Sequence, residues 1–173
     1  MGEDRACWRG SDFTLCVRAA DATLPAPASV FAGRCHMDVC TWVSQPPARE
    51  IGTGSPAVPG RLVETTARLA QSQHRGGRYP ASPPADLSWS APEPVQFFCS
   101  TTRPAFLDRD GSWTVLPFPD VFGATESITR RYLHACHPGT KASDPYQSLA
   151  TLGYAGKPTG RDLYPDFATL IRG

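Results

Sequence analysis

The clearest pattern along the chain is alternation of apolar and polar positions, which predicts β-strands. Residues 34–43 alternate in this way, and we interpret them as one continuous strand. Residues 61–70 alternate again, and their threonines favour a strand over a helix. The run "VQFFCS" at 95–100 predicts a third strand. This run and the two strands of a hairpin predicted after it, within residues 105–118, are expected to be three neighbouring antiparallel strands.

Turn residues separate the predicted strands. The segment 44–60, "SQPPAREIGTGSPAVPG", and the segment 71–94 are rich in proline and glycine, which predicts long surface loops. Asp110-Gly111 lies between two apolar stretches of "AFLDRDGSWTVLPF", and this dipeptide is a strong signal for a β-hairpin. The sheet is therefore expected to be mainly antiparallel.

Helical periodicity enters only after the last predicted strand. In residues 123–137, Ile128, Tyr132 and Cys136 fall at i, i+4 and i+8, and Pro138-Gly139 ends the segment. A short helix is expected from Asp144-Pro145 to residue 152, with a last helical turn within 164–173. The pattern predicts an α+β fold over residues 34–173, a small mainly antiparallel sheet with one packed helix, a short helical tail and long Pro/Gly-rich loops.

Residues 1–33 differ in composition from the rest and are interpreted as an N-terminal extension, either disordered or produced by an incorrectly assigned start codon. Residues 18–33 resemble a signal peptide, but Asp21, Pro25 and Pro27 interrupt the apolar part, which favours an Ala/Pro linker. No run approaches the roughly eighteen apolar residues of a transmembrane helix.

Charge and composition exclude some partners. Seventeen basic and sixteen acidic side chains give a net charge of +1, and no block of like charges occurs. Nucleic-acid binding through phosphate neutralisation is therefore not expected. We also expect no cofactor.

The even number of cysteines favours disulfides and an oxidising compartment, with unpaired core thiols as the alternative. Cys99 and Cys136 each share a face with core residues, so a bridge between them is the best single pair. Residues five apart in a strand point to opposite faces, so Cys35 and Cys40 are not expected to pair with each other. Cys7 and Cys16 could close a local loop. The six disulfide candidates are Cys7, Cys16, Cys35, Cys40, Cys99 and Cys136.

The same geometry weakens a zinc site built from the two clusters "CHMDVC" and "HACH". Its C-x4-C spacing does not let both sulfurs converge from one strand, so no metal site is expected. Ser55 in "GTGSP" does not fit the G-x-S-x-G nucleophile motif. A small hydrolase or zinc-dependent protein that uses the His/Cys clusters, with His36, His74, His134 or His137, remains the alternative to a non-catalytic protein.

The best candidate for binding is "HRGGRYP" at 74–80. His74, Arg75, Arg78 and Tyr79 surround a glycine pair there, and guanidinium and backbone N–H donors can hold an anionic group. Trp89, in the same Pro-rich segment, could face a partner. A flexible polar loop is the alternative. A protein or a small anionic ligand is the expected partner.

Five segments together resemble a group of small uncharacterised bacterial proteins: "GRCHMDVCTW", "HRGGRYP", "LSW", "FFCSTTRPA" and "ESITRRYLHACH". The resemblance spans residues 33–137 and involves Cys35, Cys40, Trp42, His74, Tyr79, Trp89, Cys99, Arg103 and Cys136. It implies no activity. Such proteins often begin with a secretion signal, and this chain lacks a clear one. We expect a non-catalytic binding or cell-envelope-associated module, periplasmic or extracellular rather than cytoplasmic.

Overall fold

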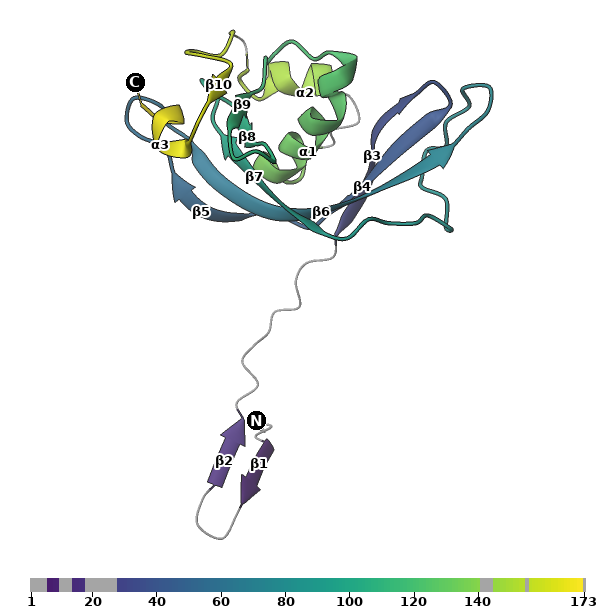
Figure 1. Cartoon of the computed structure of the whole chain (residues 1–173), viewed down its shortest axis with the longest axis vertical. Helices are drawn as coiled ribbons and strands as arrows, with labels where there is room; N and C mark the ends of the chain where they lie inside the picture. Colours follow the sequence, from purple (N-terminus) through teal and green to yellow (C-terminus); the bar gives the residue numbers. More distant parts are fainter. Residues whose placement is uncertain (1–5, 10–13, 18–27, 141–144, 155, 173) are drawn as a thin grey trace.

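The structure, a computed structural model, describes residues 6–9, 14–17, 28–140, 145–154 and 156–172 (Figure 1). Its main feature is an eight-stranded antiparallel sheet with strand order β10-β9-β8-β7-β6-β4-β3, in which β5 also pairs with β6. The strands are β3 (Ser29–His36), β4 (Val39–Gln45), β5 (Arg49–Thr53), β6 (Arg61–Gln73), β7 (Glu93–Cys99), β8 (Ala105–Leu107), β9 (Trp113–Val115) and β10 (Leu163–Tyr164). The predicted α+β class is confirmed.

The helical elements are few and short, as expected from the sequence. They are η1 (Gly123–Thr125), α1 (Glu126–Cys136), α2 (Pro145–Thr151) and α3 (Phe167–Leu170). The sheet curves around α1 and α2 (Figure 1). All three predicted helical segments are present, although the predicted cap Asp144 lies outside the described residues. Among the described residues, no helix is both long and apolar enough to cross a bilayer.

Neighbouring strand residues point to opposite faces, so the sheet has core on both sides. Phe97 packs with Tyr132 and Leu133 of α1, whereas the adjacent Phe98 packs in a second cluster with Leu170 of α3. A third cluster, around Trp42, lies on the strands farthest from α3. The alternation therefore supplies apolar side chains to three separate cores.

Two close contacts fix the helices on the sheet. Gly33 lies where α1 meets β3, and a Cβ there would be 2.5 Å from Ser127 Oγ. At the other end, the buried Arg103 guanidinium donates from Nε to Thr159 O at 3.0 Å and from Nη1 to Arg172 O at 2.8 Å. Arg103 thereby ties the C-terminal segment to the sheet.

The prediction of one strand over residues 34–43 is wrong. β3 ends at His36 and β4 begins at Val39, with a two-residue turn at Met37 and Asp38. Both turn residues have positive φ, 49° and 64°, as a type I′ hairpin turn requires. Met-Asp is not the usual Asn-Gly of such turns, so the sequence pattern concealed the hairpin.

Two strands also begin where the pattern predicted other structure. β5 lies within the segment predicted to be a turn-rich loop, and β3 begins at Ser29, inside the segment assigned to the extension. Earlier in the chain, β1 (Ala6–Arg9) and β2 (Thr14–Val17) form a separate two-stranded sheet in which Cys7 lies opposite Cys16. The bridge suggested between Cys7 and Cys16 depends on their side chains, which are not among those that the structure describes.

The hairpin changes the disulfide pattern. The predicted Cys99–Cys136 bridge is confirmed and joins β7 to α1, with a Cα–Cα distance of 5.4 Å. The expectation that Cys35 and Cys40 do not pair is wrong, because they bond to each other with Cα atoms 4.0 Å apart. The turn at residues 37–38 makes them direct cross-strand neighbours on one face.

Candidate functional site

Asp38 organises one end of the sheet, where the β3–β4 turn meets the segment after β6. Its carbonyl accepts the N–H of His74 at 2.6 Å, and its carboxylate Oδ1 accepts the N–H of Gly77 at 2.9 Å. Its own N–H points to Tyr79 Oη at 3.4 Å. We call this assembly, made of residues 37–38 and 74–79, the tip.

Side chains of β4 and β6 support the tip from below. Trp42 Nε1 donates to Ser72 Oγ at 2.7 Å, and Ser72 Oγ lies 2.6 Å from His74 Nε2. The His74 and Tyr79 rings then meet edge to face, with centroids 6.2 Å apart. A continuous chain of contacts therefore leads from the buried Trp42 to the surface at Tyr79.

The Cys35–Cys40 disulfide closes the base of the tip. Cys40 is fully buried and packs in the third core cluster together with Trp42 and Ala70. Trp89, a predicted binding residue, is half-buried against this same cluster. It also lines an open cavity of about 540 Å³ with Thr41 and Gln71. The structure thus places Trp89 in the support of this end of the sheet.

The outer surface of the tip is cationic and apolar. Arg75 and Arg78 are exposed, and neither guanidinium has a hydrogen bond or ion pair within the described part of the chain. Met37 is 80% exposed and Tyr79 is 39% exposed. Arginine, tyrosine and methionine are the residue types enriched in protein interfaces.

Backbone conformation at Gly76 and Gly77 shapes the cationic segment. Their φ angles are 78° and 67°, in the region that favours glycine. This conformation lets Gly77 N–H turn back to Asp38 while Arg75 and Arg78 remain outside. Of the predicted site residues, His74, Arg75, Arg78 and Tyr79 therefore belong to one local assembly.

Of the other candidate histidines, His36 is exposed at the end of β3, directly before the tip, whereas His134 and His137 make their contacts elsewhere. His134 on α1 stacks on Phe31 with ring centroids 5.1 Å apart, and burial lowers its pKa. His137 Nε2 lies 2.8 Å from Tyr154 Oη, and burial followed by the charge of Arg61 lowers the pKa of His137. Within the described residues, no group of three or more His, Cys, Asp or Glu side chains is placed to hold a metal ion.

The His137 contact is part of a buried network. Tyr154 Oη lies 3.0 Å from Tyr132 Oη, and Tyr132 Oη accepts the N–H of Ser100 at 3.1 Å. Burial raises the pKa of Tyr154 to about 12 and raises the pKa of Tyr132 as well. Both phenols are therefore neutral, and the network joins α1 to β7 beside the Cys99–Cys136 bridge.

The Ser72–His74 contact has the distance of a nucleophile and base, but its surroundings differ from a catalytic pair. Ser72 Oγ already accepts the Trp42 N–H, and the nearby Asp38 carboxylate accepts Gly77 N–H. Ser55 Oγ donates to the Ile171 carbonyl and accepts Val58 N–H. Each serine is accounted for by hydrogen bonds that hold backbone or core side chains.

Sequence reasoning missed Met37 and Asp38, because the predicted continuous strand concealed their turn. A signal did exist, since Asp is among the few residues that adopt positive φ readily.

No family model matches the chain, and neither does any curated protein or solved structure. The case for a function therefore comes from geometry and chemistry.

Proposed function

We propose that this chain is a non-catalytic binding module of the cell envelope, and that its tip binds an acidic surface of a protein partner. The occupant is defined by charge complementarity. Within the described ranges, Arg75 and Arg78 are exposed without a hydrogen-bond or ion-pair partner, and the carboxylate of Asp38 is directed to the Gly77 N–H. The tip therefore offers two free guanidinium groups, which form strong, often bidentate, hydrogen bonds with carboxylates.

The observation that carries this proposal is the conformation of Met37. An unbranched apolar side chain at φ 49° is unusual, because the left-handed region costs about 1 kcal/mol for residues other than glycine, asparagine and aspartate. Met37 is also 80% exposed, so burial in the fold does not compensate. Strained positions of this kind occur preferentially at functional sites.

Rigidity adds to the argument. The disulfide at the base and the three backbone contacts of Asp38 hold Met37, Tyr79 and the two arginines in one arrangement. Preorganised contact residues lose less conformational entropy when they bind. The site is thus built as an exposed, fixed contact surface rather than as a cleft for chemistry.

The disulfides support the proposed location. Two bridges, Cys35–Cys40 and Cys99–Cys136, lie within the described residues. Disulfides form and persist in oxidising compartments, so the periplasm or the extracellular space fits this chain better than the cytoplasm.

Differential selection from a displayed random-peptide library tests the proposal. The library is selected in parallel on the wild-type protein and on the double variant R75Q/R78Q. Peptides enriched on the wild type alone should be rich in aspartate and glutamate, and their binding should weaken as salt is raised. Equal enrichment on both proteins, or a set of peptides without acidic residues, would refute the tip as an acid-binding surface.

A matched control removes the same charge elsewhere. Arg161 and Arg172 are exposed and lie toward the opposite edge of the sheet, in the segment around β10 and α3. The variant R161Q/R172Q should select the same acidic peptides as the wild type. This control separates a local site from a general effect of net charge.

A further inference from the structure

Among the residues that the structure describes, Arg131 of α1 is a cation without an ion-pair partner. Its Nε is buried and has no hydrogen-bond partner, and none of its side-chain nitrogens has a partner within the described residues. Burial lowers the pKa of the Arg131 guanidinium, the charge of Glu93 raises it, and Arg109 lowers it again. A buried charged donor without an acceptor is unfavourable, so this group marks a place where an acceptor would stabilise the protein.

Arg131 faces a cavity of about 180 Å³ between α1 and the strands β6, β7 and β8. The floor of this cavity is apolar and the rim is charged. Ala67, Leu69, Val95, Phe106 and Ile128 form the apolar part, and Glu93, Asp108 and Arg109 contribute the charged part. A few polar groups above an apolar floor are typical of small-molecule sites.

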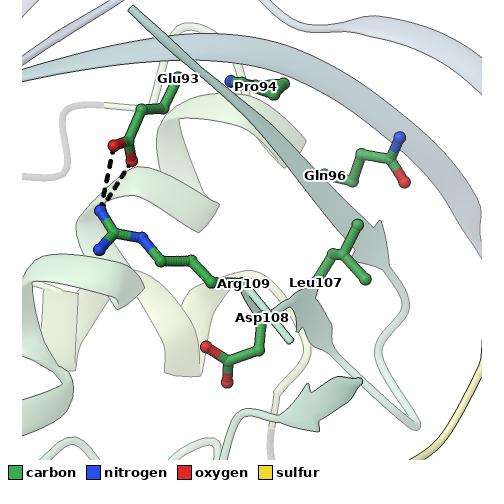
Figure 2. A pocket seen from close by; sticks show the side chains of 6 residues that line it. All are labelled: Glu93, Pro94, Gln96, Leu107, Asp108 and Arg109. Carbon is green, nitrogen blue, oxygen red and sulfur yellow. Dashed lines mark hydrogen bonds and ion pairs between the residues drawn. The ribbon is translucent and has the colours of Figure 1, made fainter. Parts of the chain in front are cut away.

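A second cavity of about 400 Å³ adjoins the first and shares Glu93, Asp108 and Arg109 with it. Figure 2 shows Arg109 reaching across to the Glu93 carboxylate. The two side chains pair at 2.9 Å, but they are 84% and 56% exposed. An ion pair so exposed contributes little to stability and can rearrange. The rim can therefore open without disturbing the core.

We propose that this cavity binds a small organic monocarboxylate, with its carboxylate on the Arg131 guanidinium and its apolar body on the floor formed by Val95, Phe106 and Ile128. The charges set the class of ligand. One unpaired guanidinium balances one negative charge, whereas the rim, where Glu93 and Asp108 outnumber Arg109, is net negative and disfavours a dianion. The apolar floor selects an organic body over an inorganic anion. This site goes beyond the proposed function, since the tip residues do not line it.

Binding of 4-phenylbutyrate to the full chain, followed by NMR, tests the proposal. The probe should shift the Ile128 methyl signal and the Arg131 Nε–H signal. The neutral amide of the same shape and inorganic phosphate should each bind at least roughly tenfold more weakly, because one lacks the charge and the other lacks the apolar body. Equal binding of the amide or of phosphate would overturn the monocarboxylate assignment.

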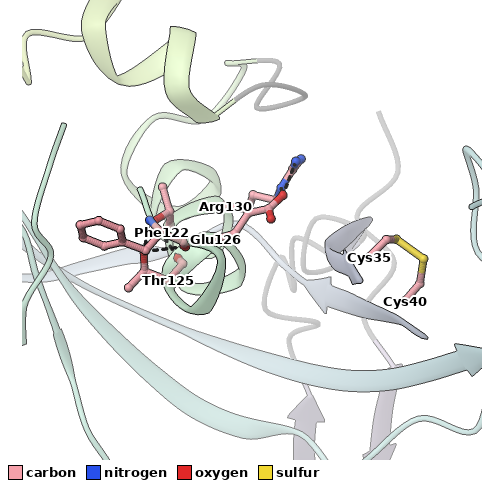
Figure 3. Close-up of polar contacts among 7 residues, drawn as sticks. Cys35, Cys40, Phe122, Thr125, Glu126 and Arg130 are labelled. Carbon is pink, nitrogen blue, oxygen red and sulfur yellow. Dashed lines mark hydrogen bonds and ion pairs between the residues drawn. A yellow bond between two sulfur atoms is a disulfide. The ribbon is translucent and has the colours of Figure 1, made fainter. Parts of the chain in front are cut away.

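Variants locate the site. Arg131→Met keeps an unbranched apolar stem and removes the guanidinium, and it should weaken 4-phenylbutyrate binding roughly tenfold or more. Arg130→Met is the matched control, since Arg130 precedes it on α1 and pairs with Glu126 at 3.0 Å (Figure 3). R75Q/R78Q should bind the probe like the wild type, so failure of this site and failure of the tip are distinguishable. Unchanged binding by a folded Arg131→Met would refute the proposal, and amide dispersion in its spectrum establishes the fold.

Discussion

Asp38 Oδ1 accepts the backbone N–H of Gly77 at 2.9 Å, across 39 residues of sequence. This bond connects the turn of the β3–β4 hairpin to the segment that carries Arg75 and Arg78. The hairpin is itself cross-linked by Cys35 and Cys40, which Figure 3 shows side by side at its end. The order of the arginine-bearing segment therefore depends on a residue that belongs to a different part of the chain.

Replacing Asp38 with alanine should release this segment. We expect the free energy of unfolding to fall by about 1 kcal/mol, because the bond is exposed but charge-assisted. Amide exchange at Gly77 should become much faster, and NMR measures both effects. Asp86→Ala, at an exposed position of the following loop, is the control and should leave Gly77 unchanged. Unaltered exchange at Gly77 in the Asp38 variant would show that the bond does not order the tip.

At Met37, we expect stability and binding affinity to be opposed, so that a substitution that improves one weakens the other. Met37→Asn should raise the free energy of unfolding by about 0.5–1 kcal/mol, since asparagine adopts positive φ more easily. The same variant should bind the acidic peptides selected on the wild type more weakly, because the exposed apolar contact is lost. Urea unfolding and peptide titration together test this opposition. A variant that gains stability and keeps full affinity for the peptides would show that the strained Met37 does not contribute to binding.

Residues 34–43 show which parts of the sheet the sequence pattern could predict and which it could not. Alternation identified β6, an apolar run identified β7, and the Asp110-Gly111 turn signal identified the β8–β9 hairpin. The same rule failed at Met37-Asp38, since a two-residue turn of type I′ leaves alternation intact on both sides while reversing the chain. Because of this one error, Cys35 and Cys40 were not expected to pair, and Asp38 was not recognised as a turn residue.

The tip could be predicted only in part for a related reason. His74, Arg75, Arg78 and Tyr79 lie within six consecutive residues, so their capacity to bind an anion could be recognised from the residue types alone. The supports of the tip come from β4 and the hairpin turn, and their proximity depends on strand pairing that no local pattern specifies. Arg131 likewise gave no signal, because its isolation is a property of packing.

The two disulfides should contribute unequally to stability. Cys99–Cys136 closes a separation of 37 residues and Cys35–Cys40 one of 5. Loop-closure entropy then gives about 4 kcal/mol for the first and about 2 kcal/mol for the second. Guanidinium unfolding of C99A/C136A and C35A/C40A measures the difference. A larger loss in C35A/C40A would contradict the entropic account, and that variant should in addition weaken peptide binding at the tip.

Stability should fall on acidification through the titration of histidine. Burial, followed by the charge of Arg61, lowers the pKa of His137 in the folded state, so the unfolded chain binds a proton more readily below about pH 6.5. Stability is thus greater above that pH and decreases as the pH falls through it, with His134 acting in the same direction. His137→Gln should reduce the difference in Tm between about pH 7.5 and about pH 5.5.

The exposed His36 provides the control for this pH experiment. His36→Gln should leave the pH dependence of Tm as it is in the wild type. A His137→Gln variant with an undiminished pH dependence would show that the burial of His137 does not couple folding to protonation.

The central claim is that Arg75 and Arg78 form a local binding surface for carboxylates. Titration of the isotope-labelled full chain with a hexaglutamate peptide at low ionic strength tests it most directly. The predicted result is a set of shifts confined to the amides of residues 37–38 and 74–79, lost in R75Q/R78Q and retained in R161Q/R172Q. Shifts spread evenly over all exposed arginines, or tip shifts that persist in R75Q/R78Q, would contradict it.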